Sequence, residues 1–224
     1  MPGLECKDLT KHYGSAPALN HVSLSIEPGR IVGLLGPNGS GKTTLINLAN
    51  GLLTPSAGEI LVCGMVPGRG SHACVSYLPE RTAIPTWMSA RQLLDFYGDF
   101  YQDFRRDAAE EMLQHLNIPL RQRIKQMSKG TREKVQLIMV MSRAAKLYLL
   151  DEPIGGVDPA TRDYILSTII SNYNPEASVV ISTHLIADVE KVLDEVLFIN
   201  QGQLMLHSTV DQIREEKGMS VDAL

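Results

Sequence analysis

The chain has 224 residues, 44% of them hydrophobic, which is enough for one large α/β domain with its own core. Its net charge of -4 argues against nucleic acid as an expected partner, because binding phosphates over a broad face needs a surplus of basic residues. No apolar run approaches the roughly 20 residues of a membrane span, and no signal peptide is recognisable, so we expect a cytoplasmic protein. Cys6, Cys63 and Cys74 show no metal-ligand spacing and are expected to be reduced thiols.

Residues 4–35 are predicted to form strands. Val22, Leu24 and Ile26 alternate with polar residues, which is typical of a strand with one buried face. Residues 31–35 form a continuous apolar run, as in a strand that is buried on both faces of a sheet. A helix is expected from the glycine-rich segment that follows to about Asn50, and a short strand is expected over residues 59–64.

The segment between this buried strand and this helix has the spacing G-x-x-x-x-G-K-T. Its glycines allow backbone N–H groups to surround a phosphate, and the helix N-terminus adds a favourable dipole. Lys42 supplies a positive charge at the β- and γ-phosphates, and the Thr43 hydroxyl suits a Mg²⁺ ligand. The sequence therefore predicts a site for ATP and Mg²⁺ that contains Gly36, Pro37, Asn38, Gly39, Ser40, Gly41, Lys42, Thr43 and Thr44.

The character of the sequence changes after Pro85. A helical pattern runs from Ser89 to about Leu116, and a second helix is expected from about Gly130 to Ala145. Because strands are expected on both sides, we predict an α/β core that carries an inserted α-helical subdomain over about residues 85–145. The remaining expected elements are strands over 75–79, 147–150 and 179–182, helices over 161–171 and 187–193, a hairpin around 201–202 and a short helix over 211–217.

The buried strand over residues 147–150 leads directly into Asp151 and Glu152. The end of such a strand is where a phosphate-loop protein holds Mg²⁺ with an Asp, directly or through water. Glu152 is placed to accept a proton from the attacking water, and a positioned general base contributes roughly 10²–10⁴-fold in rate. The alternative is that the two carboxylates form only a solvated turn.

The phosphate loop, the run Leu149–Pro153 and several further motifs resemble the nucleotide-binding subunit of an ATP-binding cassette (ABC) transporter, from about residue 4 to about residue 207. The resemblance implies one ATPase domain over residues 1–224, with a P-loop NTPase core and an N-terminal antiparallel β subdomain. It implies that Tyr13 stacks on the adenine ring, while the alternative is a surface tyrosine.

The segment Met127–Thr131 matches the family's signature motif at the start of a helix, although Lys129 replaces a glycine. The resemblance implies that Ser128 and Gly130 face the γ-phosphate of a nucleotide on a second cassette, in a homodimer or a heterodimer. Read without the family, Ser128 is an N-cap. Asp158 matches the loop that crosses this dimer interface, and it is also expected to cap the helix after Pro159.

His184 ends a buried strand and matches the histidine that contacts the γ-phosphate and orients the catalytic base and water. The implied catalytic residues are therefore Glu152, His184 and Lys42. Glu80 stands where the family usually has a glutamine on the metal side, so the implied metal-side residues are Thr43, Asp151 and Glu80. The alternative for Glu80 is a loop carboxylate without a role in the site.

The resemblance also implies a separate integral-membrane permease subunit that contains the substrate path and holds this chain at the inner face of the cell membrane. The variant signature and the run Tyr77–Glu80 look like bacterial exporter-type cassettes. The other interpretation is a soluble ABC-type ATPase switch that acts on a protein or nucleic-acid partner. Residues near the region that receives the permease form either a docking surface or ordinary helix core: Trp87, Met88, Phe96, Tyr97, Phe100 and Tyr101.

Overall fold

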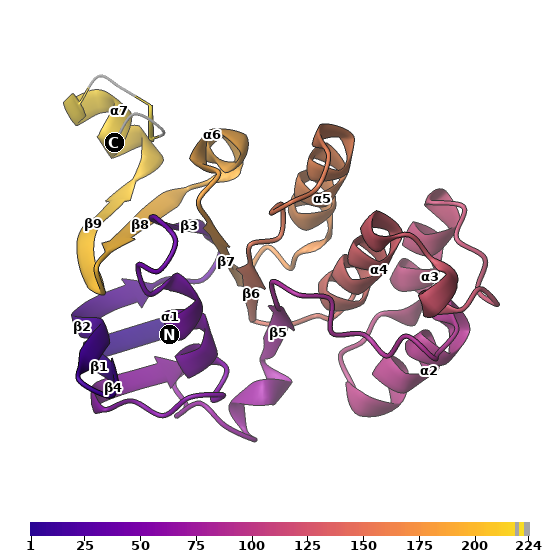
Figure 1. Ribbon diagram of the computed structural model, residues 1–224, viewed down its shortest axis with the longest axis horizontal. Coiled ribbons are helices and arrows are strands. Elements are labelled where there is room, and N and C mark those ends of the chain that lie inside the picture. The colour runs from indigo at the N-terminus through magenta and orange to yellow at the C-terminus, as the bar shows by residue number, and fades with distance from the viewer. Residues whose placement is uncertain (218–219, 222–224) are drawn as a thin grey trace.

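The computed structural model describes residues 1–217, 220 and 221, and its strands form two sheets (Figure 1). An antiparallel sheet has the order β2 (Ala16–Ile26), β1 (Leu4–Tyr13), β4 (Ala57–Val62). The second sheet is parallel except at one edge, where β8 and β9 pair antiparallel. Its order is β5 (Val75–Leu78), β6 (Leu147–Asp151), β7 (Ser178–Thr183), β3 (Ile31–Leu35), β8 (Glu195–Asn200), β9 (Gln203–Thr209).

The central strand β3 is buried along its whole length, as its apolar run predicted. Ile31 and Leu35 belong to the core cluster shared with the helices after β6, whereas Val32 and Leu34 pack in a cluster with α1 and the antiparallel sheet. The two-sided burial confirms the expected α/β core with an N-terminal antiparallel β subdomain. The helices are α1 (Lys42–Ala49), α2 (Ala90–Phe100), α3 (Arg106–His115), α4 (Lys129–Met141), α5 (Pro159–Asn172), α6 (Ile186–Val189) and α7 (Val210–Lys217).

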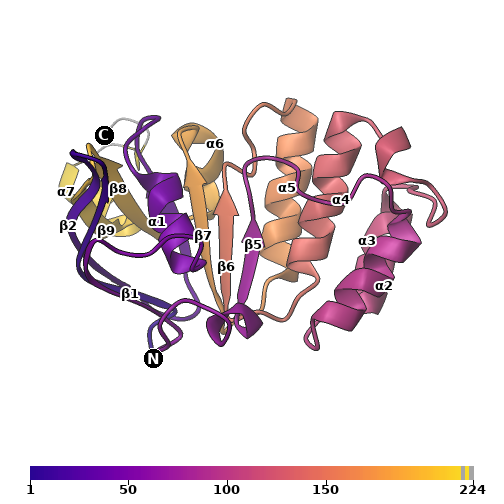
Figure 2. The ribbon, with the colours of Figure 1, turned by 60° about the horizontal axis from the view of Figure 1, so that its bottom comes forward.

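Helices α2, α3 and α4 lie together at one end of the molecule, between β5 and β6 in the chain (Figure 2). They share a hydrophobic cluster of their own, which includes Leu93, Leu113, Ile138 and Met139. The sequence pattern predicted one helix from Ser89 to Leu116, and this prediction is wrong, because α2 ends at Phe100 and α3 begins at Arg106. Likewise, the helix expected over residues 187–193 is divided into α6 and a 3₁₀ turn, Glu190–Val192.

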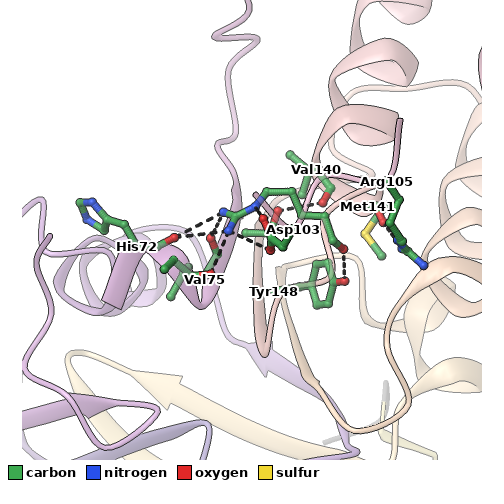
Figure 3. A network of polar contacts seen from close by, with 10 residues as sticks. His72, Val75, Asp103, Arg105, Val140, Met141 and Tyr148 are labelled. Atoms are coloured by element: carbon green, nitrogen blue, oxygen red, sulfur yellow. Dashed lines mark hydrogen bonds and ion pairs between the residues drawn. The ribbon is translucent and has the colours of Figure 1, made fainter. Parts of the chain in front are cut away.

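Arg143, just after α4, explains why the chain leaves the helix after Phe100, through a network of polar contacts that includes Asp103, which is labelled in Figure 3. Its guanidinium is almost fully buried and donates to both carboxylate oxygens of Asp103 at 3.0 Å. It also lies 3.9 Å from the centre of the Tyr101 ring and donates to the carbonyls of Ala73 and Val75. These tertiary contacts hold residues 101–105 as a linker, so local periodicity alone does not decide their conformation.

Candidate active site

The glycine-rich loop runs from the end of β3 to the start of α1. A Cβ atom on Gly36, whose φ is 144°, would lie 2.0 Å from the carbonyl oxygen of Ile199, and one on Gly41, whose φ is 114°, would lie 2.5 Å from that of Ala18. Only glycine fits these two positions, because the loop is enclosed by the ends of β8 and β2. The two glycines therefore fix the backbone that presents Lys42.

The ammonium group of Lys42 is held inside the loop. Its side chain is 6% exposed, and Nζ donates to the carbonyl oxygens of Gly36 at 2.8 Å and Pro37 at 3.2 Å. Burial lowers the pKa of Lys42, while the nearby carboxylates of Glu152 and Asp151 oppose the decrease. Nζ lies 3.8 Å from Oε1 of Glu152, so one cation links the loop to the carboxylates at the end of β6.

Asp151 is 1% exposed and accepts a hydrogen bond of 3.3 Å from the Thr43 hydroxyl. Burial raises the pKa of the Asp151 carboxyl, and the hydrogen bond from Thr43 opposes this increase. A carboxylate and a hydroxyl at this distance are the hard oxygen ligands that Mg²⁺ prefers, so the residues present fit this ion. Two of the three predicted metal-side residues, Thr43 and Asp151, come together although they are far apart in the sequence.

Glu152 has a left-handed backbone with φ of 48°, which turns its side chain back toward the end of β7. Its Oε2 atom accepts from the Thr183 hydroxyl at 3.2 Å and contacts Nδ1 of His184 at 3.0 Å. Because an ionised carboxylate only accepts hydrogen bonds, we assign a hydrogen to Nδ1 of His184. Thr183 was not assigned a role from the sequence, although a hydroxyl at the end of a buried strand, next to His184, is a signal that could have found it.

A cleft of about 880 Å³ opens over these residues. Lys129 and Glu133 of α4 also line the cleft, and Nζ of Lys129 lies 3.7 Å from Oε1 of Glu133. The sequence did not predict that either residue lines the cleft. Glu80 lies on the wall of the cleft, and the ring of Tyr13 is half-exposed at its edge. The predicted site residues that line the cleft are Tyr13, Asn38, Gly39, Gly41, Lys42, Thr43, Thr44, Glu80, Glu152 and His184.

The family model described as "ABC transporter" matches residues 19–155, which span the phosphate loop and both carboxylates. The chain belongs to this family. Among curated proteins, it is 31% identical to the SkfA peptide export ATP-binding protein SkfE of Bacillus subtilis, over 96% of this chain and 93% of that protein. It is also 31% identical to the ABC-type transporter ATP-binding protein EcsA of Bacillus subtilis, over 100% of this chain and 94% of that protein.

A solved structure described as the ATP-binding subunit of an ABC transporter superposes on this ABC subunit with a TM-score of 0.87. It is 26% identical and covers 98% of this chain and 96% of its own. The subunit is thus an ATPase of the ABC transporter family. Among the described residues, no helix of this ABC subunit has the length and apolar character needed to cross a bilayer.

The remaining predicted residues of the ABC subunit lie outside the lining of the cleft. Ser128 caps α4, because its hydroxyl accepts from the backbone N–H of Thr131 at 3.1 Å. Asp158 caps α5 by accepting from the backbone N–H of Thr161 at 3.0 Å. The hydrogen bond from the Thr161 hydroxyl lowers the pKa of the Asp158 carboxyl, and the backbone hydrogen bond adds to this decrease. Both N-cap interpretations are confirmed. Gly130 follows in the first turn of α4, and neither it nor Ser128 lines its own chain's cleft, whereas Lys129 between them does.

Proposed function

We propose that this ABC subunit hydrolyses ATP to drive export through a separate integral-membrane permease, and that two cassettes close head to tail around the nucleotides. One observation carries the proposal. Lys42, Glu152 and His184 converge on one cleft, while Ser128 and Gly130 lie on the same chain but outside that cleft. A signature segment from a second cassette would complete the site.

The geometry supports a role for each residue of the cleft. Two donors occupy Oε2 of Glu152, so Oε1 is the oxygen that accepts the proton of the attacking water. Lys42 exchanges its contacts with the loop carbonyls for contacts with the phosphates, where its charge stabilises the transition state. With Nδ1–H directed at Glu152, the Nε2 atom of His184 would donate to the γ-phosphate when the ring carries a hydrogen on both nitrogens.

Mg²⁺ would be held by Thr43 and Asp151, with Glu80 on the same side of the cleft. Bound there, the ion would neutralise charge on the phosphates during transfer. Tyr13 supplies an exposed ring at the edge of the cleft, where it can stack on adenine. Asn38, Gly39 and Thr44 complete the wall of the phosphate loop, while Pro37 and Ser40 shape its backbone.

The names of several relatives support export. The relatives include a peptide export protein and proteins of linearmycin and daunorubicin resistance, at 28–31% identity to this chain. Near the predicted permease-docking region the structure exposes Trp87, Phe96 and Phe100. The rings of Phe96 and Phe100 are stacked, with their centroids 5.5 Å apart. Met88 is buried among the helices, so it is core and not part of a docking surface. Through its permease, we propose, the subunit is held at the inner face of the cell membrane.

Glu152→Gln tests the proposed mechanism, because it keeps the size of the side chain and removes the base. We expect turnover to fall by roughly 10²-fold or more, while ATP and Mg²⁺ convert the protein from monomer to dimer in size-exclusion chromatography with light scattering. Lys42→Ala in the same background is the matched control and should stay monomeric. A Glu152→Gln protein that remains a monomer with saturating ATP and Mg²⁺ would contradict the dimer.

The permease partner is tested separately, by purifying the native protein from membranes. Recovery with a multi-spanning protein supports the transport assignment. Recovery only in the soluble fraction, with a soluble protein or nucleic acid as partner, would instead support an ATPase switch.

A further inference from the structure

Two segments of the helical insertion, residues 86–91 and 120–125, lie side by side and antiparallel. The backbone N–H of Lys125 donates to Thr86 O at 2.9 Å, that of Ile124 to Met88 O at 2.9 Å, and that of Arg91 to Leu120 O at 2.8 Å. Met88, Ala90 and Ile124 are buried against the helices. Other side chains of the two segments are exposed. We call the surface that they form the basic face, and it consists of Trp87, Arg91, Arg121, Arg123 and Lys125.

The basic face has an excess of positive charge that the rest of the chain does not share. Residues 81–94 and 116–132 contain no Asp or Glu, although the whole chain has a net charge of -4. Within the described part of the chain, Arg91, Arg121, Arg123 and Lys125 form no ion pair, whereas Arg106 on α3 pairs with Asp95 and Glu110. These cations are therefore available to an anionic partner.

Trp87 is the chain's one tryptophan and is 65% exposed. A tryptophan side chain suits a boundary between apolar and wet surroundings, because its ring is largely apolar and its N–H is polar. Exposed aromatic rings next to lysine and arginine are typical of proteins that lie in the headgroup layer of a membrane. The surface is formed by two paired segments at the end of the molecule that carries α2 and α3 (Figure 2).

We propose that the basic face contacts the anionic lipid headgroups of the membrane beside which this ABC subunit works. Charge complementarity favours this occupant, since the inner leaflet is negative and attracts cations within a Debye length of its surface. Each lysine or arginine near such a surface strengthens binding by about fivefold. The contact requires neither ATP nor a second cassette, but it rests on the proposed position of the subunit at the inner face of the membrane, where it would orient the subunit next to its permease.

Vesicle binding tests the proposal with the full-length protein without nucleotide. The probes are vesicles of phosphatidylcholine alone and of phosphatidylcholine with about a third phosphatidylglycerol, at low and high salt. We expect binding only to the anionic vesicles, and weaker binding at high salt. Because Trp87 is the one tryptophan, its emission should shift to the blue on binding, and brominated lipids should quench it.

Charge variants give the matched comparison. Arg121→Gln, Arg123→Gln and Lys125→Gln together should weaken binding at least tenfold, at unchanged ATPase activity. The control is Lys7→Gln, Arg69→Gln and Lys146→Gln, which removes the same charge from exposed residues elsewhere and should bind like the wild type.

Three outcomes would overturn the proposal: no preference for anionic vesicles, binding that leaves Trp87 emission unchanged, or an equal loss in both triple variants. If the permease protects the basic face from chemical modification and the protein binds no vesicles, the partner of this face is an acidic protein segment and not a lipid. Unchanged turnover or a persistent monomer in Glu152→Gln bears only on the proposed function, so the two failures are distinguishable.

Discussion

The Thr183 hydroxyl donates a hydrogen bond of 3.2 Å to Oε2 of Glu152 and accepts one of 3.0 Å from the backbone N–H of Leu185. Thr183 is fully buried, whereas the side chain of His184, which contacts the same oxygen, is 42% exposed. Because a hydroxyl has a single hydrogen and an ionised carboxylate only accepts, the direction of this hydrogen bond is fixed. Thr183 thus holds Glu152 from the core side through Oε2, while Oε1 faces the Lys42 ammonium at 3.8 Å.

Thr183→Val should lower kcat about tenfold with KM nearly unchanged, because a general base that loses its alignment transfers protons less efficiently. Thr183→Ser keeps the hydroxyl and should retain most of the wild-type kcat. Steady-state ATP hydrolysis measures both variants. The control is Ser178→Ala, which removes another buried hydroxyl from β7, one that bonds to Glu27 O. A valine variant with wild-type kcat would show that Thr183 does not position Glu152.

Gly36→Ala should abolish measurable ATP binding, because its Cβ would collide with the carbonyl of Ile199 and displace the phosphate loop. Binding of a fluorescent ATP analogue is the measurement. Gly98→Ala is the comparison, since a Cβ there meets no atom within 4 Å, and alanine within α2 should stabilise the protein by roughly 0.5–1 kcal/mol. Normal affinity in Gly36→Ala would refute the steric argument.

Arg143→Met should reduce the free energy of unfolding by about 3–5 kcal/mol, because it leaves Asp103 and the carbonyl of Ala73 without their buried donor. Denaturation in urea gives the value. Arg106→Gln breaks ion pairs with Asp95 and Glu110 that are largely exposed, so it should cost less than about 1 kcal/mol. Equal effects of the two changes would mean that the Arg143 network does not anchor the helical insertion.

Burial raises the pKa of the Cys6 thiol to about 12 and that of Cys63 to about 11. A raised thiol pKa lowers the fraction of thiolate at a given pH, so only about one Cys63 in a thousand is ionised at about pH 8. We therefore expect slow alkylation by iodoacetamide in the native protein, accelerating as pH increases toward 10, and fast alkylation in urea. Peptide mass spectrometry follows each site, and rapid native labelling of Cys6 would show that its site opens.

Periodicity and spacing predicted the strands and helices near the phosphate loop well, because these patterns describe local backbone conformation and burial. The apolar run over residues 31–35 became β3, and residues 147–150 became the body of β6. The linker between α2 and α3 was missed because its conformation depends on Arg143, which lies about forty residues further along the chain.

The sequence by itself determined the phosphate loop and the carboxylates at the end of β6, because these features depend on residues that are adjacent in the chain. It also carried enough ordered motifs to indicate the family. Only the tertiary structure decided which distant side chains meet. Thr183 reaches Glu152 because β6 and β7 pair in parallel, and the basic face forms because residues 86–91 pair with 120–125. Such contacts depend on strand order and packing, which the spacing of residues does not encode.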